Sequence, residues 1–126
     1  MADRASRGGP DRQHPRVTVD AFVRVLGAER EFVFRTRDLS EGGLFLYTRV
    51  GHLYPFYVGS ALQIELFDYD QSVAFHALVV RVVEPGSPEA ERFPSGFGIR
   101  IVEIDEANRA RLAKLIERAK KGEALY

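Results

Sequence analysis

The sequence predicts an all-β domain that ends in one helix, with about six strands closing into a small antiparallel barrel. Three observations lead to this prediction. Several segments alternate apolar and polar residues with a period of two, which is typical of strands with one buried face. Glycine, proline and short polar residues separate these segments. One segment near the C-terminus instead has the spacing of an amphipathic helix.

The first two predicted strands form a hairpin. Residues 17–26 place valine or alanine at alternate positions, and residues 30–37 carry Phe32 and Phe34 on one face. Residues 27–29 would form the turn between them. The expected strands are residues 17–26, 30–37, 44–47, 60–67, 72–84 and 96–102.

Two longer connections read as loops. Residues 49–59 contain Tyr54, Phe56 and Tyr57, and we expect these rings to pack over the end of the barrel. Residues 85–95 are rich in proline and would form a surface loop.

The final helix is expected to begin after Asp105, whose side chain can cap it, and to run to about Lys121. Gly122 would end it. Its apolar stripe consists of Leu112, Leu115, Ile116 and Ala119. This stripe predicts that the helix packs against the barrel.

Composition limits the possible functions. The 18 basic residues balance the 18 acidic ones, so no overall positive field attracts nucleic acid or anionic lipid. Cysteine is absent, which excludes disulfides, thiolate metal sites and a cysteine nucleophile. The sequence contains neither a signal-peptide pattern nor a run of ~20 apolar residues. We therefore expect a soluble, cytoplasmic domain that does not insert into membranes.

A chain of 126 residues is long enough for one hydrophobic core and short for two. Residues 1–11 have little to bury and are expected to form a flexible N-terminal arm. Residues 12–121 would form a single, stand-alone domain. Residues 122–126 would form a C-terminal tail.

Two motifs carry the functional prediction. Asp38, Ser40 and Gly43 belong to a polar, glycine-rich stretch, residues 38–43, that reads as a loop between strands. Arg12 and Arg16 form an R-x-x-x-R pair immediately before the first strand. A hairpin returns the chain to its starting point, so both motifs should lie at the same end of the sheet.

With both motifs complete, the sequence resembles the PilZ domain family, whose pattern is R-x-x-x-R, a hairpin, then D/N-x-S-x-x-G. The resemblance covers roughly residues 12–118 and extends through Gly42-Gly43-Leu44-Phe45-Leu46 and Gly98-Ile99-Arg100-Ile101. It implies a six-stranded barrel and a non-catalytic receptor for cyclic diguanylate (c-di-GMP), a bacterial second messenger. A downstream protein, not identified by the sequence, would receive the signal.

The resemblance assigns the ligand to Arg12, Arg16, Asp38, Ser40 and Gly43, and their chemistry suits it. Arginine forks bind phosphate oxygens or the O6/N7 edge of guanine. A carboxylate can accept from guanine N1 and N2, a serine hydroxyl can bond phosphate or base, and glycine permits close backbone approach. The N-terminal arm would fold over the bound nucleotide.

One position departs from the family pattern. Many members carry a further arginine directly before the pair, where this chain has Asp11. The family links that arginine to a stacked ligand dimer, so we expect one nucleotide per domain. Arg4 and Arg7 could supply the missing charge from the arm, although solvated tail residues would look the same.

Three other functions remain open at the level of sequence. His14, His52 and His76 could contribute to a catalytic site, although none has a nucleophile-elbow context. Small barrels can stack single-stranded bases on exposed rings, although zero net charge argues against nucleic acid. A PilZ-like interaction adaptor with little or no nucleotide binding is the third.

Overall fold

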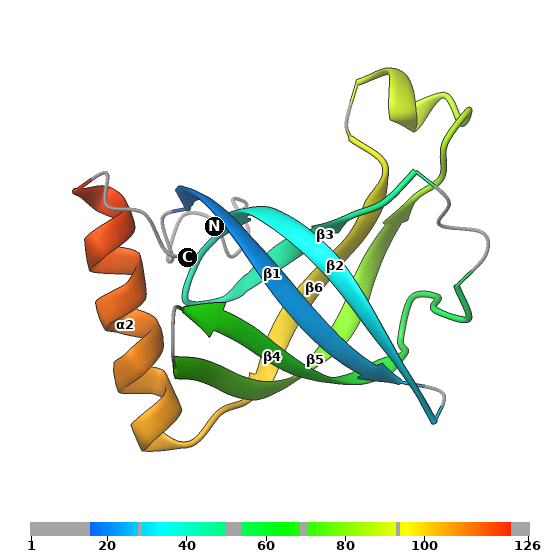
Figure 1. The fold of residues 1–126 in the computed structure, drawn as a ribbon. Coiled ribbons are helices and arrows are strands. Elements are labelled where there is room, and N and C mark those ends of the chain that lie inside the picture. The colour runs from blue at the N-terminus through cyan, green and yellow to red at the C-terminus, as the bar shows by residue number, and fades with distance from the viewer. Residues whose placement is uncertain (1–15, 28, 50–53, 69–70, 93, 122–126) are drawn as a thin grey trace, which may run out of the picture.

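The structure is a computed structural model that describes residues 16–27, 29–49, 54–68, 71–92 and 94–121. Six antiparallel strands close into a barrel in the order β1-β2-β3-β6-β5-β4, and helix α2 follows them (Figure 1). The strands are β1 (Val17–Gly27), β2 (Arg30–Leu39), β3 (Gly43–Tyr47), β4 (Ala61–Asp68), β5 (Gln71–Val83) and β6 (Gly96–Glu103). The predicted fold class is confirmed.

The alternation in β1 gives the barrel one of its inner walls. Val17, Val19, Ala21, Val23 and Val25 are all buried, while most residues between them are exposed. Because successive side chains of a strand point to opposite faces, every second residue of β1 points into the core. Closure of the barrel then leaves β1 hydrogen-bonded on both sides, to β2 and to β4.

Aromatic rings fill part of the core. Phe34 of β2 lies 4.8 Å from Tyr54, 6.2 Å from Phe56 and 6.0 Å from Phe97, measured between ring centroids. Phe97 is fully buried and Phe56 is 6% exposed. All three rings of the 49–59 connection were predicted to pack over the end of the barrel. Phe56 is buried and Tyr54 packs against the core, whereas Tyr57 is 71% exposed.

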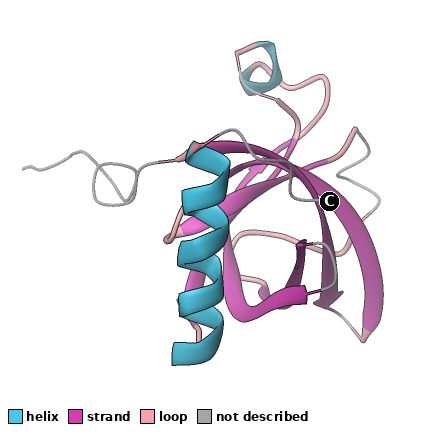
Figure 2. Ribbon diagram, turned by 60° about the vertical axis from the view of Figure 1, so that its left-hand side comes forward, coloured by secondary structure: helices cyan, strands magenta, loops and turns pink. Residues whose placement is uncertain are grey.

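Helix α2 (Glu106–Lys120) lies against the outside of the barrel, next to β1 and β5 (Figures 1 and 2). The Asp105 carboxylate caps it by accepting from the Asn108 N–H at 2.8 Å, and this bond lowers the pKa of Asp105. Leu112, Leu115 and Ile116 are buried, which confirms the predicted stripe. The predicted stop at Gly122 lies outside the described residues. In the described part of the chain, no helix is long and apolar enough to cross a bilayer.

The structure differs from the sequence prediction in two places. Strand β2 continues to Leu39, so Asp38 lies on a strand and the connection to β3 is reduced to residues 40–42. The extension arises because Asp38 pairs with Thr18, and Leu39 with Val17, across the hairpin. The β5–β6 loop, which projects from the barrel in Figures 1 and 2, contains a short 3-10 helix, η2 (Glu89–Glu91), that was not predicted.

Candidate functional site

Arg16 and Asp38, one residue of each sequence motif, meet at one end of the β1–β2 hairpin. Arg16 directly precedes β1, and Asp38 lies near the end of β2. The Arg16 Nη1 donates to Asp38 Oδ1 at 3.0 Å. Both side chains keep about a third of their surface exposed, at 39% and 30%. A guanidinium and a carboxylate are thus held side by side at a partly exposed position.

A bulge in β2 turns Asp38 away from the core. Between the Arg35–Tyr47 and Leu39–Leu44 pairs, β2 advances by four residues while β3 advances by three. The extra residue breaks the alternation, since Thr36 and Leu39 are buried and Asp38 between them is only half-buried. Without the bulge, the alternation that buries Phe34 and Thr36 would also bury Asp38.

Thr36 holds this bulge in place. Its side chain is fully buried, and its hydroxyl lies 2.9 Å from both the Asp38 and the Phe45 carbonyl oxygens. The hydroxyl can donate to one of them at a time or be shared between both. A buried polar group needs such partners, and here they join β2 to β3 beside the site.

Tyr47, at the end of β3, engages the other oxygen of Asp38. Its hydroxyl donates to Asp38 Oδ2 at 2.7 Å. The pKa of Tyr47 is raised to about 12. The largest cause is burial of the phenol, and the hydrogen bond to Asp38 and the charge of that carboxylate add to it. The Arg37 guanidinium lies over the Tyr47 ring, 5.5 Å from its centroid. Tyr47 is therefore a neutral donor at physiological pH.

Ser40 organises the β2–β3 connection. Its hydroxyl oxygen accepts from the N–H groups of Gly42 and Gly43 at 3.1 and 3.2 Å, and the side chain is 2% exposed. The Ser40 N–H donates to the Gly43 carbonyl at 2.9 Å. In this structure the Ser40 hydroxyl stabilises the turn through hydrogen bonds within it, as Ser side chains commonly do in such connections.

Gly43 allows β6 to approach β3. A Cβ atom at this position would lie 2.1 Å from the Ile99 carbonyl oxygen and 3.2 Å from Arg100 Cα. Because both contacts are with backbone, they could not be relieved by rotating a side chain. The last glycine of the motif thus has a packing role in the barrel, in addition to the ligand role predicted for it.

The structure places Arg16, Asp38, Ser40 and Gly43 within one region and leaves Arg12 outside the described residues. The other N-terminal candidates, Arg4, Arg7, Asp11 and His14, also lie outside them. Sequence reasoning did not identify Tyr47, Thr36 or Arg37 as parts of the site. No spacing pattern marks Tyr47, because its contact with Asp38 depends on the shifted register between β2 and β3.

The residues named for other functions are dispersed. The His76 side chain on β5 is 55% exposed and lies beside Glu103, with Nδ1 and Oε1 3.5 Å apart. His14 and His52 lie outside the described residues. Phe56 is buried in the core and Tyr54 packs against it, whereas Tyr57 is 71% exposed. Among the described residues, no group of three or more His, Cys, Asp or Glu could hold a metal ion.

Comparisons with known proteins agree with the barrel fold. The sequence pattern that defines the family described as "PilZ domain" matches residues 10–118. A comparison with curated proteins gives no match.

Three solved structures have a similar fold, each with 17–19% sequence identity. The motility inhibitor MotI/DgrA of Bacillus subtilis has a TM-score of 0.69 over 88% of this chain and 52% of its own. The PilZ domain of YcgR from Escherichia coli, solved with c-di-GMP, has a TM-score of 0.66 over 87% and 92%. The K. pneumonia MrkH–c-di-GMP complex has a TM-score of 0.65 over 88% and 54%. This chain thus spans about half of MotI and of MrkH.

Proposed function

This chain belongs to the PilZ domain family, a family of c-di-GMP receptors, and we propose that it binds c-di-GMP through Arg12, Arg16, Asp38, Ser40 and Gly43. PilZ domains are generally non-catalytic, so we further propose that the chain is not an enzyme and acts through a downstream protein in the cytoplasm. In this proposal, ligand binding orders the N-terminal residues that contain Arg12.

The observation that carries the proposal is the contact between Arg16 and Asp38. These residues are far apart in sequence, yet the hairpin brings Nη1 and Oδ1 to 3.0 Å at a partly exposed position. A guanidinium can bind the phosphate or the O6/N7 edge of guanine, and a carboxylate can accept from guanine N1 and N2. Placed side by side, the two groups complement the charged and hydrogen-bonding parts of one nucleotide.

A second function, that of a nucleotide-independent interaction adaptor, is favoured by a different observation. The Ser40 hydroxyl is bonded within its own connection, and Gly43 is needed where β3 meets β6. Both motif residues therefore have structural reasons to be present without any ligand. A domain that binds only a protein partner would need them as well.

Calorimetric titration with c-di-GMP at physiological salt separates the two functions. We expect the wild type to bind with a Kd near micromolar, about −8 kcal/mol, and Arg12→Ala/Arg16→Ala to lose this binding. Arg92→Ala/Arg109→Ala is the matched control, since it removes two exposed arginines from η2's end and from α2. Absence of heat with the wild type at high protein concentration would exclude the receptor and leave the adaptor.

The same titration tests the proposed stoichiometry. Because Asp11 stands where many family members have arginine, we expect one nucleotide per domain. Asp11→Arg should tighten binding, since it replaces a negative charge near the ligand phosphates with a positive one. A wild-type stoichiometry of two nucleotides would contradict this part of the proposal.

A further inference from the structure

We propose that Tyr47 is a positioning residue for guanine recognition, holding the Asp38 carboxylate so that the site prefers guanine to adenine. This inference rests on the proposed function, since it concerns how the same site distinguishes between nucleotides. Tyr47 belongs to neither of the two sequence motifs.

The Asp38 carboxylate is held through both of its oxygens. Asp38 Oδ1 accepts from Arg16 at 3.0 Å, and Oδ2 accepts from Tyr47 at 2.7 Å. Arg16 precedes β1 and Tyr47 ends β3, so the carboxylate of β2 is held from both neighbouring strands. Two bonds to different oxygens restrain the rotation of a carboxylate more than a single bond does.

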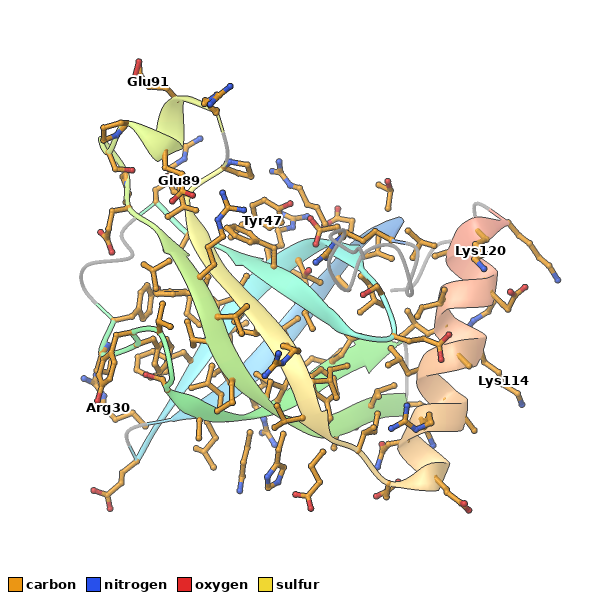
Figure 3. The ribbon with its side chains drawn as sticks, turned by 180° about the vertical axis from the view of Figure 1, so that it is seen from behind. Arg30, Tyr47, Glu89, Glu91, Lys114 and Lys120 are labelled. Atoms are coloured by element: carbon orange, nitrogen blue, oxygen red, sulfur yellow. The ribbon has the colours of Figure 1, made fainter. Side chains whose placement is uncertain are left out.

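Tyr47 is itself held by two neighbouring side chains. Its ring lies 4.9 Å from that of Phe45 and has the Arg37 guanidinium over its face. Figure 3 shows Tyr47 on the barrel wall, well separated from α2, where Lys114 and Lys120 are labelled. With a pKa of about 12, its hydroxyl keeps its proton and can only stabilise Asp38 as a donor to the carboxylate. The phenol is thus a fixed support.

Guanine and adenine differ in the groups that they present to a carboxylate. Guanine presents two adjacent donors, N1–H and the N2 amino group, and an aligned carboxylate can accept from both. Adenine has an acceptor at N1, which a carboxylate repels. Each carboxylate oxygen has two lone pairs, so Arg16 and Tyr47 leave one on each oxygen for the base. The preference for guanine therefore depends on the orientation that Tyr47 maintains.

The test is to measure the affinities of wild type and Tyr47→Phe for c-di-GMP and for cyclic diadenylate. Phenylalanine keeps the ring beside Phe45 and Arg37 and removes only the hydroxyl. We expect affinity for c-di-GMP to fall about tenfold or more, as for the loss of a hydrogen bond to a charged group, and the guanine-to-adenine ratio to shrink with it. Tyr57→Phe, which removes an exposed hydroxyl, is the matched control and should leave both values unchanged.

A double-mutant cycle with Asp38→Asn separates positioning from a general effect on the fold. If Tyr47 acts through Asp38, Tyr47→Phe should have little further effect once Asp38 is changed. Additive effects, or an unchanged guanine-to-adenine ratio in Tyr47→Phe, would overturn the inference while leaving the receptor function intact.

A wild type that binds neither nucleotide would remove both the receptor function and this inference. Should Tyr47→Phe fail to fold, the crystal structure of the wild type with c-di-GMP decides the question. The inference requires Tyr47 Oη within hydrogen-bond distance of Asp38 in that complex, and a separation beyond it would contradict the inference.

Discussion

The two halves of strand β2 are held in place by different kinds of interaction. In its first half, Phe32 and Phe34 enter a cluster of rings, and Phe34 alone lies within 6.4 Å of four other ring centroids. In its second half, Thr36 and Asp38 are held by individual hydrogen bonds to β3 and to Arg16. One half thus relies on many weak contacts, and the other on a few directional ones.

This difference has consequences for function. Ring packing is spread over many atoms, so it stabilises the barrel without requiring any one contact to have a particular geometry. Hydrogen bonds depend on the position of single atoms, and the bulge that exposes Asp38 relies on one buried hydroxyl. We therefore expect substitutions in the first half to affect stability, and those in the second half to affect the site.

The largest expected effect is on the aromatic half. Phe34→Ala would leave a cavity among Tyr54, Phe56 and Phe97, and large-to-small aromatic changes of this kind cost about 3–5 kcal/mol. Urea unfolding measures the change in the free energy of unfolding. Val33→Ala, next to it on the same strand and 61% exposed, is the control and should cost less than about 0.5 kcal/mol. Equal losses of unfolding free energy in the two variants would contradict the role of the ring cluster in stabilising the first half of β2.

An intermediate effect is expected where the site connects to β6. Gly43→Ala places a methyl group 2.1 Å from the Ile99 carbonyl oxygen, and we expect a loss of about 1–3 kcal/mol, as for overpacking. At Gly98 the nearest atom to an added methyl is a side-chain Cβ of Arg81, at 3.3 Å. Gly98→Ala should therefore cost less, and urea unfolding of both variants makes the comparison. A harmless Gly43→Ala would leave ligand approach as the reason for this glycine.

In the polar half of β2, the smallest expected effect on stability comes from the alkaline titration of Tyr47, which is bonded to Asp38. Burial and the Asp38 carboxylate raise the pKa of Tyr47 to about 12 against the opposing charges of Arg37 and Arg16, whereas in the unfolded chain it is near 10. Above pH 10 the unfolded chain releases this proton first, so stability from this group is present below pH 10 and falls as pH rises towards 12.

Phenolate absorbance provides the measurement. Subtracting the titration of Tyr47→Phe from that of the wild type should leave one tyrosine with a midpoint near 12, as long as the protein stays folded. The titration of the wild type minus that of Tyr57→Phe serves as the comparison, since the Tyr57 ring is mostly exposed. A Tyr47 midpoint close to 10 would mean that its bond to Asp38 is absent in solution.

The local pattern of the sequence alone determined the strands, the capped helix and the meeting of Arg16 with Asp38. Alternation decides which face of a strand is buried, and a hairpin necessarily returns β2 to the start of β1. The Asp105 cap and the Leu112, Leu115 and Ile116 stripe were predictable for the same reason. In each case the deciding interactions lie within a helix, a strand or one hairpin.

The tertiary structure alone decided how the polar groups around Asp38 are arranged. The bond from Tyr47 to Asp38 exists because β2 gains one residue relative to β3, a shift that Thr36 stabilises from inside the barrel. The role of Gly43 appears only when β6 closes against β3 at Ile99. These contacts depend on cross-strand register and on barrel closure, which bring together residues that no local pattern connects.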